Sequence, residues 1–444
     1  MTEKSRLVNI LDKVLPKDIP GEIIVLTQHQ RVSRMLQNNL VQGSECEKML
    51  VRVRVEEGGR VGEEATNVFS LSSLRQTVAR ARKRAETGPP GPLILSGYKG
   101  YREMSQAPAA TSTQSPQAQA AMLAPLADLA GKANLLVDAC LSAEIGELAI
   151  VNTLGLAAHT KAAFSEAKIS VASTTGPGRG CGYACDRNAE KLDVIAPFFR
   201  AAAKCQASER PLPLPAGEYT VILEPAAAAD LIRVAAKIFF DGRAFLERRT
   251  PFAQLGARLF GDQLSIWDDS LHPQGLQMPF DFEGVPKQRL NLVNRGIIQA
   301  VCLDNETAAQ LKTVSTGHAA LPDSGSGPIP RHLAVEAGNA MIDDMIASTK
   351  RGILVSRFHD ISVLDSCAAV ITGTTACGTL LVEEGKLTAA LPDLRFVQNL
   401  SRALSNIEMT GDETKLFGGL WEGLLVPALK LNRFSFLTGN TGQV

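Results

Sequence analysis

The sequence predicts an α+β protein in two parts, an N-terminal α/β domain of sheet and helices followed by a largely antiparallel β domain. Three observations indicate this class. The chain has 444 residues, which is enough for two or three domains and a sizeable core. Its first 90 residues carry helix and strand patterns in turn. Its second half carries a run of apolar segments separated by glycine-containing turns.

The first 90 residues predict a helix, two strands and a second helix. Residues 5–15 have helical spacing that ends at Pro16, and the strands are EIIVLT at 22–27 and MLVRVRV at 49–55. The second helix runs over 74–86, because serines before it supply N-caps and a Thr-Gly-Pro-Pro segment stops it. These elements suit a layered arrangement of helices on a sheet.

Two segments of unusual composition divide the chain. Residues 107–125 are rich in Ala, Ser, Thr, Gln and Pro and predict an exposed loop before helical spacing resumes at Leu126. Residues 209–217, ERPLPLPAG, contain three alternating prolines, which favour an extended connection. We therefore place the domain boundary there, with an N-terminal domain at 1–208 and a C-terminal domain at 218–444.

The C-terminal part predicts a strand, a helix and then antiparallel strands. The strand YTVILEP at 219–225 precedes a helical stretch at 226–245. Two polar segments that contain Gly separate pairs of apolar runs, as in short hairpins. The two hairpin turns are predicted at 294–296 and 383–386. A closing strand is predicted at 426–439 and a surface loop at 322–330.

The composition argues against several functional classes. The 46 Lys and Arg residues balance the 46 Asp and Glu residues, so the chain lacks the basic excess of a nucleic-acid-binding protein. Charged side chains interrupt the most apolar stretch, 120–159, which argues against a transmembrane segment. The first residues lack the unbroken apolar centre of a secretory signal. We expect a cytoplasmic protein that binds neither nucleic acid nor membrane.

The eight cysteines are expected to be reduced thiols, mostly small buried side chains, because they are spread without a paired framework. Cys181 and Cys185 have a weak metal-ligand spacing, but structural zinc usually needs a second pair, so we interpret them as thiols in a turn. The glycines of 175–180 lack the Gly-Lys-Ser/Thr ending of a phosphate-binding loop and predict a flexible surface loop.

The six histidines do not predict a metal site. None lies three, four or five residues from another, as two zinc ligands on one helix face would. His359 and Asp360 are adjacent, but neighbouring residues of a strand point to opposite faces, which argues against a dyad between them.

Two polar segments could carry chemistry, and the residues alone leave two interpretations of each. Asp281 and Glu283 could raise each other's pKa for acid–base work. They could instead accept backbone hydrogen bonds, or pair with Arg289, at a junction of strand and turn. The STGH segment at 315–318 could line a groove or form a capped turn.

The C-terminal half contains four blocks in a fixed order: GEYTVILEPAAAADLI, PFDFEGVPKQRLNLVNRGIIQAVCLDNETAAQLKTVSTGHA, ITGTTACGTLLVEEGKL and LRFVQNLSRALSNI. In this order the blocks resemble the TldD/PmbA family, once labelled modulators of DNA gyrase. The resemblance covers most of 213–444. It extends more loosely to the first half, through MLVRVRVEEGGRVGEEATN and the helix after it.

TldD members resemble zinc peptidases, in which the helix after the E-P strand carries H-E-x-x-x-H and a C-terminal cysteine adds a ligand. Here Arg233, Val234 and Ile238 stand at the motif positions, and the final stretch LFGGLWEGLLVPALKL has no cysteine. Arg is permanently charged and Val and Ile have no lone pair, so this chain is expected to hold no zinc there. It looks like the TldE (PmbA) type, the metal-free partner subunit.

The resemblance implies a non-catalytic subunit of a cytoplasmic, heterodimeric TldD-type zinc metallopeptidase, with the zinc in the TldD-type partner and the peptide substrate held as an added strand. The alternative is a homodimeric peptide-binding or scaffold protein without peptidase activity. An enzyme of altered mechanism, using Cys181, Cys185 or the two carboxylates, has no support in the spacing. By analogy, the groove residues that would bind peptide without catalysing its cleavage are Asp281, Glu283, Gly284, Arg289, Thr316, Gly317 and His318.

Overall fold

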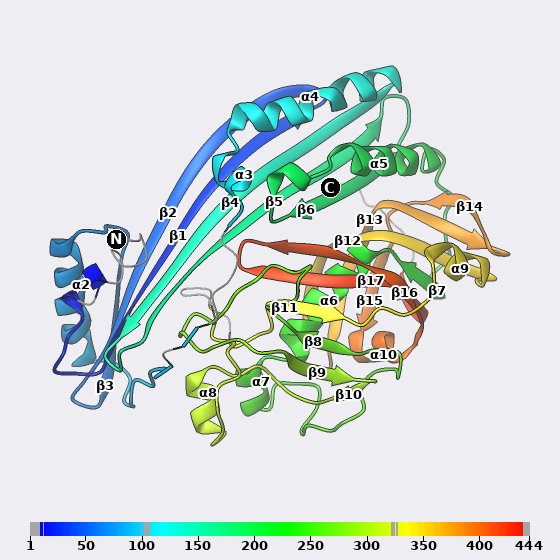
Figure 1. The fold of residues 1–444 in the computed structure, drawn as a ribbon. Coiled ribbons are helices and arrows are strands. Elements are labelled where there is room, and N and C mark those ends of the chain that lie inside the picture. The colour runs from blue at the N-terminus through cyan, green and yellow to red at the C-terminus, as the bar shows by residue number, and fades with distance from the viewer. Residues whose placement is uncertain are drawn as a thin grey trace.

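The chain folds into two sheets, and the predicted α+β class is confirmed. The computed structural model describes residues 9–98, 100–101, 107–320, 325 and 327–437, apart from residue 12. Figure 1 shows the first sheet arching over the body that contains the second. Within the predicted helix at 5–15, residues 9–11 and 13–14 are helical, whereas 5–8 and 12 lie outside the described residues.

The first sheet has six antiparallel strands in the order β3-β2-β1-β4-β5-β6. They are β1 (Gly21–Leu36), β2 (Asn39–Glu57), β3 (Arg60–Thr66), β4 (Leu135–Asn152), β5 (Ala157–Ser173) and β6 (Arg179–Asp186). The strands predicted at 22–27 and 49–55 are confirmed as the best-buried ends of β1 and β2. Most of the rest of these two strands is half-buried or exposed, so the apolar pattern that predicts a strand is missing there.

The two faces of this sheet pack against different layers. Side chains alternate between the faces of a strand, so Ile23 and Val25 face one side while Ile24 faces the other. Ile23 and Val25 pack with helix α2 (Leu71–Ala85), whereas Ile24 packs against the C-terminal body. The first sheet is therefore buried on both sides near this end. The predicted serine cap is confirmed, because Ser70 Oγ accepts a hydrogen bond from the Ser73 amide, 3.2 Å away.

The exposed loop predicted at 107–125 is wrong. This segment forms α3 (Ala109–Thr113) and most of α4 (Pro116–Lys132). Ser115 caps α4 by accepting a hydrogen bond from the Ala118 amide, and Pro116 occupies the first turn, where its missing N–H costs nothing. The Ala- and Gln-rich composition hid a helix because both residues are good helix formers. Its buried face consists of Gln119, Leu123, Leu126 and Ala130.

A row of glycines in and before β6 allows helix α5 (Ile195–Ala207) to lie directly on the strand. The surface loop predicted at 175–180 is therefore wrong for its second half, since Gly178 and Gly180 are buried. A Cβ atom added at any of three alternate glycines would lie within 2.4 Å of a backbone carbonyl oxygen of α5. The carbonyl groups belong to Cys205, Ala201 and Pro197 for Gly178, Gly180 and Gly182, respectively.

Replacing Gly180 with Ala is expected to lower the free energy of unfolding by about 2 kcal/mol. The new methyl group would lie 2.0 Å from the Ala201 carbonyl oxygen, so α5 would have to move away from β6. Chemical denaturation measures the change. Gly131→Ala in α4 is the control, because its Cβ has nothing within 4 Å and Ala is the better helix former. Equal stability of the two variants would contradict the packing argument.

The second sheet has 11 strands and is largely antiparallel, with β11–β17 and β7–β12 as its parallel pairs among the described residues. Its strands are β7 (Gly217–Leu223), β8 (Ile266–Asp268), β9 (Leu290–Asn294), β10 (Ile297–Ile298), β11 (His332–Val335), β12 (Arg351–Asp365), β13 (Val370–Glu383), β14 (Lys386–Leu391), β15 (Arg395–Asn399), β16 (Ile407–Gly419) and β17 (Glu422–Phe436). The helices of this part are α6 (Pro225–Phe239), α7 (Gly242–Leu246), α8 (Asn305–Gln310), α9 (Ile342–Ala347) and α10 (Leu400–Ser405). The predicted closing strand is confirmed as β17.

Both predicted hairpins are present. β9 and β10 are joined by Arg295 and Gly296, and β13 and β14 by Glu384 and Gly385. All four turn residues have positive φ angles, between 46° and 78°, as short primed turns between twisted strands require. The predicted helix at 226–245 is divided, because α6 ends at Phe239 and α7 begins at Gly242.

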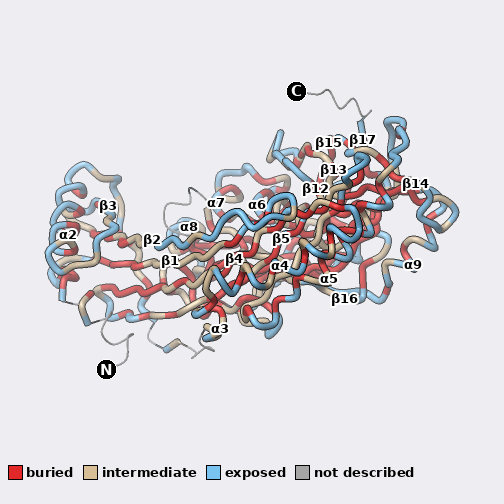
Figure 2. Tube along the Cα trace, turned by 90° about the horizontal axis from the view of Figure 1, so that it is seen from above, coloured by how far each residue is buried: buried red, intermediate tan, exposed pale blue. Residues whose placement is uncertain are grey.

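The first sheet and the C-terminal body share a hydrophobic layer. Leu148 and Ile150 of β4 pack with Phe280, Phe282 and, at the β16–β17 turn, Trp421. Figure 2 shows buried segments along the long strands of the first sheet and along strands of the second sheet. The Pro-rich connection predicted at 209–217 links α5 to β7. This connection is also bonded to β14, because the Leu212 amide donates a hydrogen bond to the Ala390 carbonyl.

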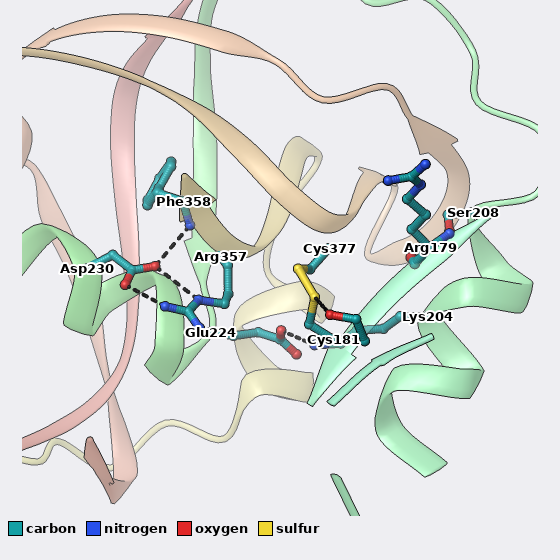
Figure 3. Close-up of a disulfide and its surroundings, with 10 residues drawn as sticks. Arg179, Cys181, Lys204, Ser208, Glu224, Asp230, Arg357, Phe358 and Cys377 are labelled. Carbon is teal, nitrogen blue, oxygen red and sulfur yellow. Dashed lines mark hydrogen bonds and ion pairs between the residues drawn. A yellow bond between two sulfur atoms is a disulfide. The ribbon is translucent and has the colours of Figure 1, made fainter. Parts of the chain in front are cut away.

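A disulfide between Cys181 of β6 and Cys377 of β13 joins the two sheets (Figure 3). The expectation of eight reduced thiols is wrong for this pair, because 196 residues separate two strands whose proximity the sequence does not reveal. Beside it, Lys204 of α5 forms an ion pair with Glu224 at the start of α6. The free cysteines are Cys46 and Cys367, which are exposed, Cys140 and Cys185, which are half-buried, and Cys205 and Cys302, which are buried.

Candidate functional site

A buried charge cluster of Asp268, Lys287 and His318 lies at the centre of the C-terminal body. Asp268 ends β8, and its Oδ1 lies 3.2 Å from Lys287 Nζ and 3.2 Å from His318 Nε2. All three side chains are almost completely inaccessible to solvent. Burial alone would raise the pKa of Asp268, but Lys287 and His318 outweigh it and hold the pKa well below its usual range. Asp268 is therefore a carboxylate paired with the lysine.

The same carboxylate fixes the start of β11. Asp268 Oδ2 accepts hydrogen bonds from the amides of Arg331 and His332, at 2.8 and 2.7 Å. Each of these two residues lines its own cavity, Arg331 one beside α6 and His332 one between β5 and the C-terminal body. Burial, aided by Lys287, lowers the pKa of His332 to about 3, so its imidazole is neutral near pH 7.

The structure brings the two predicted polar loops together. Asp281 Oδ1 accepts hydrogen bonds from the amides of Glu283 and Val285, both 2.9 Å long, and thereby closes its own turn. Its Oδ2 accepts a third bond, of 2.8 Å, from the Ala319 amide at the end of the STGH loop. Asp281 is buried, and burial raises the pKa of its carboxyl group. Asp281 thus ties one loop to the other.

Glu283 pairs with the first sheet and not with Arg289. Its Oε1 lies 3.4 Å from the Arg54 guanidinium of β2, and its Oε2 accepts a 3.0 Å hydrogen bond from the Asn305 amide. Glu22 of β1, also buried, pairs with the same guanidinium. Burial raises the pKa of Glu283 to about 8; Arg54 opposes this rise and Asp281 adds to it. The predicted pairing with Arg289 is wrong, because that guanidinium stacks over the Trp267 ring, 4.2 Å from its centroid.

The remaining predicted groove residues form tight turns. Gly284 and Gly317 have φ angles of 73° and 75°, which favour glycine. The Gly284 carbonyl accepts a 2.7 Å hydrogen bond from the Tyr101 hydroxyl. Thr316 Oγ1 accepts a 2.7 Å bond from the Leu303 amide and lies 2.9 Å from His318 Nδ1. The STGH segment is therefore a capped turn, and its side chains bond to the protein itself.

The positions matched to the zinc motif lie on α6 beside an open cavity. Arg233 is 41% exposed, Val234 is half-buried and Ile238 is buried. A guanidinium and two aliphatic side chains do not fit zinc, which needs lone pairs from His, Cys or carboxylate groups. In the part of the chain that the structure describes, no group of three or more His, Cys, Asp or Glu could hold a metal ion.

Two other predictions about candidate residues are wrong. Cys181 and Cys185 lie on a strand and not in a turn; one is in the disulfide and the other donates a hydrogen bond to the Leu416 carbonyl. His359 Nδ1 lies 3.0 Å from Asp360 Oδ2, although the residues are adjacent on β12. A bulge with a positive φ of 50° at Asp360 breaks the alternation. Both side chains are mostly exposed, so this is a surface contact.

Sequence reasoning missed Arg54, Glu22, Asp268, Lys287 and Arg331. No local motif links any of them to the groups it contacts, because those groups are distant in the sequence. The one available signal was weak: Arg54 and Glu22 belong to apolar strands, where a charged residue that is buried must be paired.

No helix among the described residues is long and apolar enough to cross a membrane.

Comparison with known proteins assigns the chain to a family. Residues 216–437 match a family model described as the PmbA/TldA metallopeptidase C-terminal domain. A metalloprotease TldD homolog of Haemophilus influenzae is 26% identical over 245 residues, which cover 53% of this chain and 50% of the relative. Metalloprotease PmbA of Escherichia coli O157:H7 is 25% identical over 181 residues, or 40% and 37% of the two chains. The chain matches about half the length or less of these curated relatives.

Two solved structures have the same fold over nearly their whole length. TldE from Thermococcus kodakarensis superposes with a TM-score of 0.87 at 21% sequence identity, covering 98% of this chain and 99% of that one. A putative modulator of DNA gyrase from Thermotoga maritima gives a TM-score of 0.86 at 20% identity, with the same coverage. These structures show that the fold is shared, and the family model matches half of the sequence; the chain therefore belongs to the PmbA/TldD family.

Proposed function

We propose that this chain is the non-catalytic subunit of a cytoplasmic metallopeptidase complex, in which a TldD-type partner supplies the zinc and this chain binds extended peptide. The observation that carries the proposal is the composition of α6. Its motif positions hold Arg233, Val234 and Ile238, which cannot ligate zinc or activate a water, yet a cavity lies beside the helix. Relatives named metalloproteases and a structural neighbour named TldE are consistent with this role.

The buried polar groups also favour a binding role over catalysis. Asp281 and His318 are buried and the Glu283 side chain is 13% exposed, and all three are bonded to backbone or to charged partners. A general acid or base must reach the proton that it transfers, and Asp281 and His318 are too deeply buried to reach a substrate. Asp281 ties the two polar loops to each other, and Glu283 ties the first of them to Asn305.

The chain purified alone without chelators is expected to contain substoichiometric zinc by elemental analysis and to leave extended peptides uncut. Co-purified with a TldD-type chain that carries H-E-x-x-x-H, it should give a complex that cleaves them. The matched control is the same complex with the motif glutamate of the partner replaced by Gln, which should assemble without activity. Stoichiometric zinc and cleavage by this chain alone would overturn the proposal.

A further inference from the structure

The cavity beside α6 is built from three segments that are distant in sequence. Arg233, Ala236 and Lys237 come from α6, Arg331 and Leu333 from β11 and the residue before it, and Glu422 to Leu424 from the start of β17. The volume is about 130 Å³, which is room for a small group and not for a globular partner. Its apolar lining consists of Ala236, Ile329, Pro330, Leu333 and Leu424.

The charges around this cavity are not balanced. Three cations, Arg233, Lys237 and Arg331, face one anion, Glu422. Glu422 is 4.0 Å from Arg233, at the limit of an ion pair, and both side chains are more than 40% exposed, so the contact contributes little. Lys237 has no ion pair within the described parts of the chain. The cavity therefore carries an excess of two positive charges.

Arg331 has an unsatisfied hydrogen-bond donor, although its guanidinium lies over the Phe282 ring, 5.9 Å from the centroid. Its Nε–H is buried and has no hydrogen-bond acceptor among the described residues, although the Arg331 backbone amide donates to Asp268. Burial lowers the pKa of the guanidinium, which an anion in the cavity would reverse. An unpaired N–H of a guanidinium is costly to bury unless a ligand completes its hydrogen bonds. A planar carboxylate matches the geometry of that group.

We propose that the α6 cavity is a carboxylate-binding site, where Arg233, Lys237 and Arg331 hold a carboxylate of an extended peptide and the apolar lining accepts the adjacent small side chain. The carboxylate is either the α-carboxylate of the peptide C-terminus or the side chain of an Asp or Glu residue. This inference rests on the proposed peptide-binding function. It adds the chemical feature by which this subunit selects and orients its peptide.

The test uses three octapeptides of Ala, Val and Thr, labelled with fluorescein at the N-terminus and titrated with the purified chain by fluorescence anisotropy. The first has a free C-terminal carboxylate, the second is the same peptide as its C-terminal amide, and the third is the amide with one residue replaced by Glu. We expect the first or the third to bind at least about tenfold more tightly than the second. Which of the two binds tightly identifies the source of the carboxylate.

The double variant Arg233→Gln/Lys237→Gln should abolish the difference between peptides and leave binding of the neutral amide unchanged. The matched control is Arg351→Gln/Lys386→Gln, because Arg351 is also exposed and also lies 4.0 Å from a glutamate, Glu383, which is paired in register with Lys386. Equal binding of all three peptides, or equal effects of the two double variants, would overturn the carboxylate site while peptide binding stands. No binding of any peptide would overturn both the site and the proposed function.

Discussion

Replacing Asp268 with Asn lowers the free energy of unfolding by about 3–5 kcal/mol, because it leaves a lysine buried without its counter-charge. Lys287 and Asp268 are 2% and 0% exposed, and their charged atoms are 3.2 Å apart. Asn keeps an oxygen that can still accept the amide hydrogen bonds of Arg331 and His332, so the variant removes charge more than hydrogen bonding. Denaturation in urea at pH 7 measures the loss.

Asp230→Asn is the matched control for this prediction. Asp230 also pairs with a cation, Arg357, at 3.1 Å and also accepts a backbone hydrogen bond, from the Phe358 amide, but Arg357 is 35% exposed. Water can solvate the Arg357 guanidinium when its counter-charge is removed, so the loss in free energy of unfolding should stay at about 1 kcal/mol. The double variant Asp268→Leu/Lys287→Met should recover part of the loss, since it removes both charges. Equal losses at Asp268 and Asp230 would show that the burial of the lysine is unimportant.

Removing the Cys181–Cys377 disulfide is expected to cost about 4 kcal/mol of stability, because the bond closes a loop across 196 residues of sequence. Thermal denaturation of Cys181→Ser/Cys377→Ser should show a lower Tm than the wild type. Dithiothreitol should bring the wild type down to the Tm of the variant and leave the variant unchanged. Both effects have the same cause, the greater conformational freedom of the unfolded chain once the bond is absent.

The control for the disulfide variant is Cys46→Ser/Cys367→Ser, which makes the same two Cys-to-Ser substitutions at exposed free thiols. Its Tm should match that of the wild type with and without dithiothreitol. If the wild type instead contained eight titratable thiols under non-reducing conditions, the bond would be absent and the prediction would be wrong.

Local patterns predicted the parts of the fold that one short segment determines. The hairpin turns at Arg295 and Glu384 followed from polar residues with Gly between apolar runs, and the Ser70 cap followed from a serine before a helical pattern. The part of α4 before Leu126 was missed because its Ala- and Gln-rich sequence hides a narrow buried face. The outer halves of β1 and β2 were missed because they lie largely outside the core.

The candidate site was predictable only in part. The sequence singled out Asp281 and Glu283, and their loop does meet the STGH turn. Their partners could not be predicted, because Arg54 and Ala319 are brought near by the packing of the two sheets and not by spacing along the chain. The Cys181–Cys377 bond was hidden for the same reason.

Two of the connections between the first sheet and the C-terminal body lie toward opposite edges of the first sheet. Arg54 lies in β2, one strand from one edge, and binds Glu283; Cys181 lies in β6, the other edge, and is bonded to Cys377. A hinge motion that opened the molecule about the connection between α5 and β7 would therefore require loss of the Arg54–Glu283 ion pair or reduction of the Cys181–Cys377 disulfide. A peptide bound as proposed would therefore have to reach its site with both connections in place.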